Sequence, residues 1–132
     1  MGLDDMVYFT GRIPDEDLWK YLATADICVD PDPLTQWSNL STMNKIMEYM
    51  AFGRPIVAFD LLENRRSAMD AAIYVTPNKT DEMASTIRQL IESEEKREVM
   101  SKYGRQRFES NLCWDYSAKV LVGAYTSLLF HR

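Results

Sequence analysis

Four polar side chains between residues 41 and 48 have the types and spacing to hold a phosphate and a sugar. Ser41 and Thr42 carry hydroxyls, Lys45 carries a positive charge and Glu48 carries a carboxylate. In a helix that begins near Thr42, the hydroxyls, the lysine and the free backbone amides would lie at the N-terminus, where phosphates bind. Glu48 would lie about two turns further along and could accept hydrogen bonds from sugar hydroxyls. The segment therefore predicts a phosphate at the helix end and a diol beyond it.

The apolar residues of the same segment predict a helix from about residue 42 to residue 52. They recur at intervals of three and four residues and so form one buried stripe of Met43, Ile46, Met47, Met50 and Ala51. Glu48 falls off this stripe and shares a polar strip with Ser41 and Asn44, with Lys45 at its edge. A simpler interpretation is that this strip is only the solvated face of an amphipathic helix, with Ser41 or Thr42 as its N-cap.

Short apolar runs that alternate with helical patterns predict the fold that positions this helix. Strands are expected at 7–10, 26–30, 56–59 and 72–75. Helices are expected from Pro14, over 63–69, from Thr80, from Glu94 to about 103 with an end at Gly104, and over 114–129. The fold class is therefore α/β: a Rossmann-like parallel sheet of about four strands with flanking helices and a helical C-terminal end. Ligands of such sheets bind outside the carboxyl ends of the strands, where the helix after 26–30 begins.

Composition limits the classes of function. The chain has 132 residues, of which 46% are apolar, so it suffices for one domain with a core and is unlike a disordered tail. A net charge of −5 argues against nucleic acid as the main partner. Cys28, Cys113 and the single histidine, His131, are too far apart in the sequence to predict a zinc site or a histidine-based catalytic pair. Without a signal peptide pattern or a run of about 20 apolar residues, a cytoplasmic location is expected.

Three segments, taken in order, resemble the retaining family-4 glycosyltransferases of the GT-B fold. "IMEYMAFGRPIVAFD" resembles that family's "LEAMACGKPVVA" segment. "VYFTGRIPDEDLWKYLATADICVDP" resembles the segment before it, and "MSKYGRQRFESNLCWDYSAKVLVGAY" resembles the C-terminal segment. The likeness covers nearly the whole chain. It implies that residues 1–132 are a single, truncated C-terminal domain that binds the nucleotide-sugar donor.

The resemblance also implies roles for individual residues. Glu48 matches a motif glutamate that holds the ribose hydroxyls. The loop for the donor sugar and diphosphate matches Leu40, Ser41, Thr42 and Met43, and the loop beside the nucleobase matches Gly11, Arg12 and Ile13. A simpler interpretation is an ordinary turn for Gly11 and a solvated side chain for Arg12. No cofactor is implied beyond the nucleotide-diphosphate sugar, which is a substrate, and neither a catalytic residue nor a metal is predicted in this chain.

The chain departs from the family's pattern at one site position. Leu40 stands where the first motif glutamate is expected, so the contacts of that carboxylate with the donor sugar do not carry over. The loop would then bind through its amides or use Asn39 differently. Two alternatives therefore stay open: a non-catalytic nucleotide-binding module, and a Rossmann-like interaction domain with no ligand.

The family's earlier strand–helix units and its acceptor domain have no counterpart in this chain. We therefore expect the chain alone to transfer no sugar and to need that N-terminal domain as its partner. Loss of central strands would also expose a sheet edge, which predicts a homo-oligomer formed through that edge. For the full-length enzyme, peripheral contact with a membrane is a further possibility that the resemblance leaves open.

Overall fold

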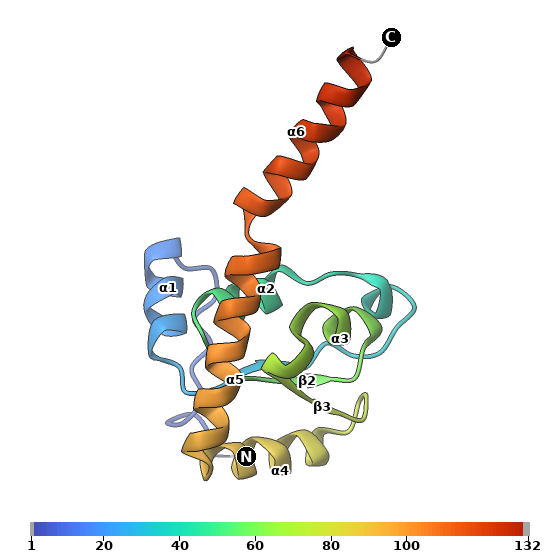
Figure 1. Ribbon diagram of the computed structural model, residues 1–132. Coiled ribbons are helices and arrows are strands. Elements are labelled where there is room, and N and C mark those ends of the chain that lie inside the picture. The colour runs from blue at the N-terminus through green and yellow to red at the C-terminus, as the bar shows by residue number, and fades with distance from the viewer. Residues whose placement is uncertain (1, 131–132) are drawn as a thin grey trace.

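A parallel sheet with helices on both faces forms the body of the molecule (Figure 1). The computed structural model describes residues 2–130, so Met1, His131 and Arg132 lie outside the described residues. Its three strands lie in the order β1 (Cys28–Asp30), β2 (Ile56–Phe59) and β3 (Ala72–Val75), and both pairings are parallel. The central strand β2 is buried at every position because helices cover both of its faces. The predicted parallel α/β sheet is confirmed.

Six α-helices and three shorter helical turns connect and extend the strands of the described chain. The α-helices are α1 (Asp15–Thr24), α2 (Asn44–Ala51), α3 (Leu62–Ala68), α4 (Thr80–Ile91), α5 (Glu94–Arg107) and α6 (Trp114–Phe130). The turns are η1 (Ser38–Leu40), η2 (Met69–Ala71) and η3 (Phe108–Leu112), the last of which is a π-turn. None of the helices within residues 2–130 is both long enough and apolar enough to cross a lipid bilayer.

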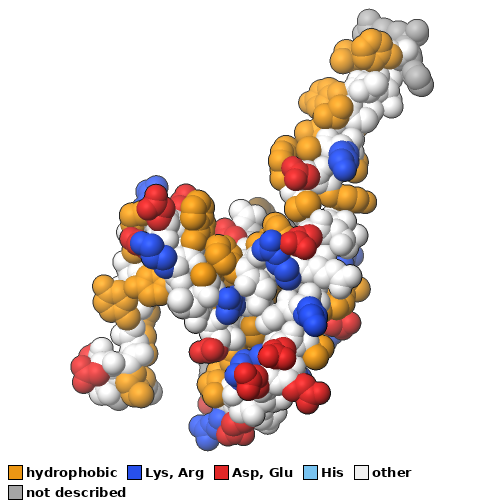
Figure 2. Space-filling model, turned by 60° about the vertical axis from the view of Figure 1, so that its left-hand side comes forward, with side chains coloured by type: hydrophobic (Ala, Val, Ile, Leu, Met, Phe, Trp, Pro, Cys, Tyr) orange, Lys and Arg blue, Asp and Glu red, His pale blue; other side chains and the backbone are white. Residues whose placement is uncertain are grey.

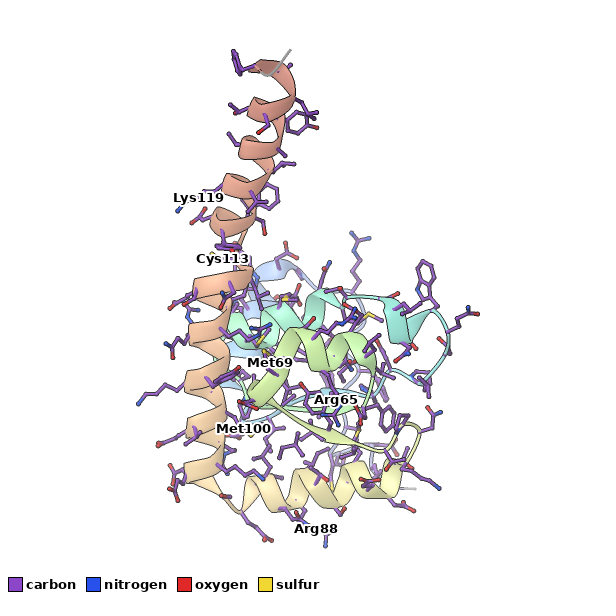
Figure 3. The ribbon with its side chains drawn as sticks, turned by 45° about the vertical axis from the view of Figure 1, so that its right-hand side comes forward. Arg65, Met69, Arg88, Met100, Cys113 and Lys119 are labelled. Carbon is purple, nitrogen blue, oxygen red and sulfur yellow. The ribbon has the colours of Figure 1, made fainter. Side chains whose placement is uncertain are left out.

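The core consists of two clusters, one on each face of the sheet, because successive side chains of β2 point to opposite faces. One cluster joins Ile56 and Ala58 of β2 to Ile46 and Met50 of α2. The other joins Val57 and Phe59 to α4 and α5, including Met100, which Figure 3 labels on α5. The predicted apolar stripe of α2 is confirmed in these contacts, since Ile46 and Met50 are fully buried.

The strand predicted at 7–10 is wrong, and the sheet has three strands where about four were expected. In the described chain this segment has no regular structure, and Phe9 is 91% exposed. A strand needs a hydrogen-bonded neighbour, and the described sheet ends at β1 without taking up this segment. On the free side of β1, the hydroxyl of Tyr49 donates a hydrogen bond to the carbonyl oxygen of Val29 at 3.3 Å. Part of the exposed edge predicted from the sequence is thus covered from α2.

Gly104 does not end α5, as the sequence predicted, but lies buried inside it. A Cβ atom at Gly104 would stand 3.1 Å from the Cβ of Ala71 and 3.3 Å from the Cγ of Met50. The glycine therefore allows α5 to approach α2 and η2 closely, and the helix continues to Arg107. Glycine in a helix lowers stability by about 1 kcal/mol relative to alanine. The close packing explains why a glycine stands here despite that loss.

Arginine side chains fix the C-terminal ends of four helices by donating to their last carbonyl oxygens. Arg54 donates to Ala23 and Ala25 at 2.8 and 3.0 Å at the end of α1, and Arg107 donates to Arg66 and Ser67 at 2.8 and 2.7 Å in the last turn of α3. Arg105 donates to Ala51 at the end of α2, and Arg97 donates to Leu90 and Ile91 at the end of α4. Such contacts satisfy carbonyls that have no partner within the helix and place positive charge at the negative end of its dipole.

Helix α6 leaves the body of the molecule and projects away from it (Figure 1). Cys113 marks the point of departure, between the π-turn and the first turn of α6 (Figure 3). Within the described chain, α6 buries none of its residues. The apolar side predicted for this helix therefore faces solvent: Val120, Leu121, Ala124, Tyr125 and Leu128.

Candidate functional site

The loop between β1 and α2 is held in place by its own polar side chains. The buried hydroxyl of Ser38 donates to the carbonyl oxygen of Pro33 at 2.6 Å, and the amide of Ser38 donates to the hydroxyl of Thr35 at 3.0 Å. The side-chain oxygen of Asn39 accepts a hydrogen bond from the amide of Leu62 at 2.9 Å and so caps the first turn of α3. These contacts fix the loop at the carboxyl ends of β1 and β2, where ligands of parallel sheets bind.

The N-terminus of α2 has no polar cap. The residue before the helix is Met43, and within the described chain no side chain caps the first turn. Ser41 and Thr42 are not the N-cap, because the hydroxyl of Ser41 donates to the carbonyl oxygen of Trp37 at 2.8 Å and that of Thr42 donates to Glu63 at 2.9 Å. The first amides of α2 are therefore available to an anionic ligand.

Lys45 lies between two carboxylates that come from the end of β1 and the loop after it. Its ammonium group donates to one oxygen of Asp30 at 3.1 Å and to both oxygens of Asp32 at 2.9 Å. The side chain of Asp30 is fully buried, whereas that of Asp32 is 29% exposed. The second oxygen of Asp30 accepts from the side-chain amide of Asn64 in α3 at 2.8 Å. One buried carboxylate thus ties together β1, α2 and α3.

These contacts determine the charge of the site. Partial burial alone would lower the pKa of Lys45, but the hydrogen bonds to Asp32 and Asp30 outweigh it and raise that pKa, so the lysine stays protonated. A second pair lies beside it, where Glu63 accepts from Arg66 at 2.7 Å as well as from Thr42. These two bonds, that from Arg66 first, lower the pKa of Glu63. The charge of Lys45 is consequently already balanced by carboxylates.

A second positively charged side chain at this end of the sheet, that of Arg65, is also paired with a carboxylate. Arg65 of α3, labelled in Figure 3, donates from Nη2 to a carboxylate oxygen of Asp60 at 2.7 Å and pairs with the other oxygen through Nε. Its guanidinium carbon also lies 4.6 Å from the centre of the ring of Tyr74. Arg65 is thus held in one orientation beside the end of β2, in a geometry that suits guanidinium groups.

The side chains that surround the start of α2 on its open side are exposed. Asn44 and Glu48 lie on the surface of the helix, as the predicted polar strip requires. Leu40 is 63% exposed and Trp37 is 82% exposed, although the loop that carries them is tightly bonded. The bonded loop therefore holds a leucine and an indole in solvent beside the start of α2.

The residues predicted for the nucleobase lie in a different setting. Gly11 has a positive φ of 61°, which suits a glycine turn, and Arg12 is exposed. Ile13 lines a shallow groove with Tyr8 and with side chains of α1 such as Tyr21. The structure thus brings together the candidates from Leu40 to Glu48, on η1, α2 and the residues between them. Of the nucleobase candidates, Ile13 lies against side chains of α1, whereas Gly11 and Arg12 are exposed.

Three site residues escaped the sequence analysis: Asp30, Asp32 and Asn64. Asp30 closes an apolar run and Asp32 follows two positions later, and Lys45 in the next helix carries the opposite charge. That combination is a signal that could have suggested the pairing. Asn64 has no comparable signal, since it is one polar residue among several in α3. Among residues 2–130, no group of three or more His, Cys, Asp and Glu side chains is arranged to hold a metal ion.

Comparisons with known proteins agree with this architecture. Residues 1–93 match the family described as "Glycosyl transferases group 1". The chain is 28% identical over 133 aligned residues to an MMP α-(1→4)-mannosyltransferase of Mycolicibacterium hassiacum, covering 95% of this chain and 30% of that protein. Its fold matches the sucrose-phosphate synthase of Thermosynechococcus elongatus with a TM-score of 0.82 at 24% identity, over 98% of this chain and 32% of the other. The chain spans about a third of the length of both relatives.

The last comparison concerns fold alone, and it confirms the expected α/β fold of a GT-B fragment. The family match covers residues 1–93, which is well over half of the 132-residue chain, and it contains β1, β2, β3 and the site around α2. The chain therefore belongs to the group 1 glycosyl transferases.

Proposed function

We propose that this chain is the donor-side domain of a retaining glycosyltransferase, which binds a nucleotide-diphosphate sugar and supplies it for transfer to a glycan, a lipid or another acceptor. The observation that carries this proposal is the uncapped start of α2 at the carboxyl ends of the strands, in a chain of this family. Free amides at a helix N-terminus suit the diphosphate, and the exposed carboxylate of Glu48 suits the ribose diol.

The contacts around α2 refine the roles that we propose. Lys45 is paired with two carboxylates, so the phosphates would be held chiefly by the amides of Met43, Asn44 and Lys45. The hydroxyls of Ser41 and Thr42 each donate their one proton within the chain, so at the rim they can accept hydrogen bonds, for example from sugar hydroxyls. Leu40 offers the donor sugar only an apolar contact. We keep Gly11, Arg12 and Ile13 as proposed neighbours of the nucleobase.

Replacing Glu48 by alanine should weaken the binding of a nucleoside diphosphate by about tenfold to a hundredfold, because hydrogen bonds to a charged group are worth about 1.5–3 kcal/mol. Isothermal titration with uridine and guanosine diphosphates measures this effect. Glu98→Ala is the matched control, since Glu98 is also an exposed glutamate inside a helix, and its affinity should equal that of the unaltered chain. Equal affinities for Glu48→Ala and Glu98→Ala would remove Glu48 from the site. Failure of the unaltered chain to bind either nucleotide would contradict the proposed function.

The chain alone should transfer no sugar, because we propose that the reaction needs an acceptor domain that completes the cleft. Both relatives are about three times as long as this chain. The test is to incubate the chain with UDP-glucose or GDP-mannose and simple sugar acceptors, and to follow the release of nucleoside diphosphate. Turnover above that of a heat-denatured sample would contradict this prediction and would locate a complete active site in the 132 residues.

Leu40 favours a second candidate function, a non-catalytic nucleotide-binding module. A leucine that is 63% exposed stands where a carboxylate would be expected to contact the donor sugar. Such a module would bind nucleoside diphosphates as tightly as nucleotide sugars, whereas a donor domain should prefer the sugar-bearing form. We propose a cytoplasmic location for either function, with membrane contact arising only from the remainder of a full-length enzyme.

A further inference from the structure

The ammonium group of Lys45 stands at the N-terminal end of α2, and its charge is more than balanced there. Lys45 is the second residue of the helix, and helical side chains lean toward the helix N-terminus. Its ammonium group lies 3.1 Å from an oxygen of the buried Asp30 and 2.9 Å from both oxygens of Asp32. Two carboxylates and one ammonium group therefore leave one unbalanced negative charge beside the first amides of α2.

The charged side chains that α3 and the end of β2 contribute to this end of the sheet are paired one to one. Glu63 accepts from Arg66 at 2.7 Å, and Asp60 accepts from Nη2 of Arg65 at 2.7 Å. Each of these pairs is neutral as a whole, so neither offsets the extra negative charge at Lys45. Of the two carboxylates that contact Lys45, only that of Asp32 is partly exposed and can face a ligand.

The remaining titratable groups of β1 and α2 supply no positive charge. Burial raises the pKa of Cys28 to about 11 and that of Tyr49 to about 12, so both groups are neutral at neutral pH. Glu48 adds a further carboxylate on the exposed side of α2. Figure 2 shows acidic and basic side chains interspersed over the body of the molecule. Exposed charges more than about 8 Å away are largely screened at physiological salt, so the charge beside α2 is set locally.

The nucleotide sugar and the nucleoside diphosphate that it leaves behind differ by one negative charge. In the nucleotide sugar each phosphate has one ionised oxygen, so the diphosphate carries two charges. Transfer joins the sugar carbon to the acceptor oxygen and breaks its bond to the phosphate oxygen, which keeps the electron pair, and the proton of the acceptor passes to that phosphate or to water. The terminal phosphate then ionises a second time at about pH 6, so above that pH the nucleoside diphosphate carries three charges.

We propose that Asp32 makes this site favour the nucleotide sugar over the free nucleoside diphosphate. The unbalanced charge repels the third negative charge of the nucleoside diphosphate, and the contact of Asp32 with Lys45 holds that cation back from the phosphates. Asp32 is thus a specificity residue that also positions Lys45, and it promotes the exchange of product for donor. The inference rests on the proposed function, since it requires phosphates to bind at the start of α2.

Isothermal titration of the full chain with UDP and UDP-glucose, and with GDP and GDP-mannose, at pH 5.5 and pH 8.0 tests this assignment. In the unaltered chain, the affinity for the nucleoside diphosphate relative to the nucleotide sugar should fall about tenfold from the lower to the higher pH, because a third charge is added to one ligand only. Asp32→Asn should reduce this fall to about twofold and leave the ratio at pH 5.5 nearly unchanged. Asp32→Glu keeps the charge and should behave like the unaltered chain.

Asp26→Asn is the matched control, because it removes the same charge from an exposed aspartate just before β1, whereas Asp32 follows the end of that strand. It should leave the affinity ratio unchanged at both pH values. Near-ultraviolet circular dichroism checks that the variants keep the fold. The pH dependence of the unaltered chain tests the inference even if Asp32→Asn does not fold.

Three outcomes would overturn the inference while leaving the proposed function intact, because in each of them both ligands bind. The first is an affinity ratio that does not depend on pH in the unaltered chain. The second is a pH dependence that persists in Asp32→Asn, which would assign the discrimination to another charge. The third is an equal loss of affinity for the nucleotide sugar in Asp32→Asn at both pH values, which would indicate direct contact with sugar hydroxyls. Binding of neither ligand would overturn the proposed function and this inference together.

Discussion

Replacing Asp30 by alanine is expected to lower the free energy of unfolding by about 3 kcal/mol. Asp30 is fully buried, and its carboxylate accepts from Lys45 at 3.1 Å and from Asn64 at 2.8 Å. Alanine would leave the buried amide of Asn64 with a single acceptor, the carbonyl oxygen of Phe59 at 3.2 Å. The loss lies at the lower end of the range for broken buried pairs, because Lys45 is partly exposed and keeps Asp32.

Urea unfolding at one fixed protein concentration measures this loss, since association of the chain would otherwise add to the apparent stability. Asp30→Asn keeps an acceptor for Asn64 and removes the charge, so it should cost about 1–2 kcal/mol. Asp26→Ala is the control, because Asp26 is an exposed acid just before the same strand and should change stability by less than about 0.5 kcal/mol. An Asp30→Ala variant as stable as Asp26→Ala would show that the buried network does not hold these elements together.

The elements whose apolar pattern is local were predictable from the sequence. The strands at 56–59 and 72–75 were placed correctly because short apolar runs between helices are typical of a covered parallel sheet. The run at 7–10 looks equally apolar, but a strand also needs a neighbour, and pairing is a property of the whole sheet. Gly104 was misread for a similar reason. A glycine late in a helix signals the end of that helix unless another element packs against it. At Gly104 that element is η2, whose Ala71 lies more than thirty positions away in the sequence, so the local pattern does not reveal the contact.

The candidate site was predictable in position but not in its contacts. The spacing of apolar residues placed Glu48 on the exposed side of α2, and it lies there. Lys45 was predicted to face a phosphate, whereas its ammonium group contacts Asp30 and Asp32. Sequence distance hid this pairing, since the side chains come from a strand, a loop and a helix. The predicted contact of Lys45 with a phosphate stays a prediction.

Replacing Gly104 by leucine is expected to destabilise the chain by about 3 kcal/mol, at the upper end of the cost of overpacking. The first added carbon would already stand 3.1 Å from the Cβ of Ala71, and three further carbons would have to enter the contact between α5, α2 and η2. Gly104→Ala adds only that first carbon and also gains about 1 kcal/mol of helix propensity, so its net effect should be much smaller. Urea unfolding of both variants gives the comparison.

A double-mutant cycle with Ala71→Gly identifies the cause. Ala71→Gly removes the methyl group that the new Cβ would meet, so Gly104→Ala should be less harmful in that background by about 1 kcal/mol. The added carbon would also stand 3.3 Å from the Cγ of Met50, but this contact is the same in both backgrounds and cancels in the cycle. Additive effects of the two substitutions would mean that α5 and η2 do not touch at Gly104. If Gly104→Ala is less harmful in the Ala71→Gly background, packing requires the glycine, even though a glycine near the end of a helix resembles a cap.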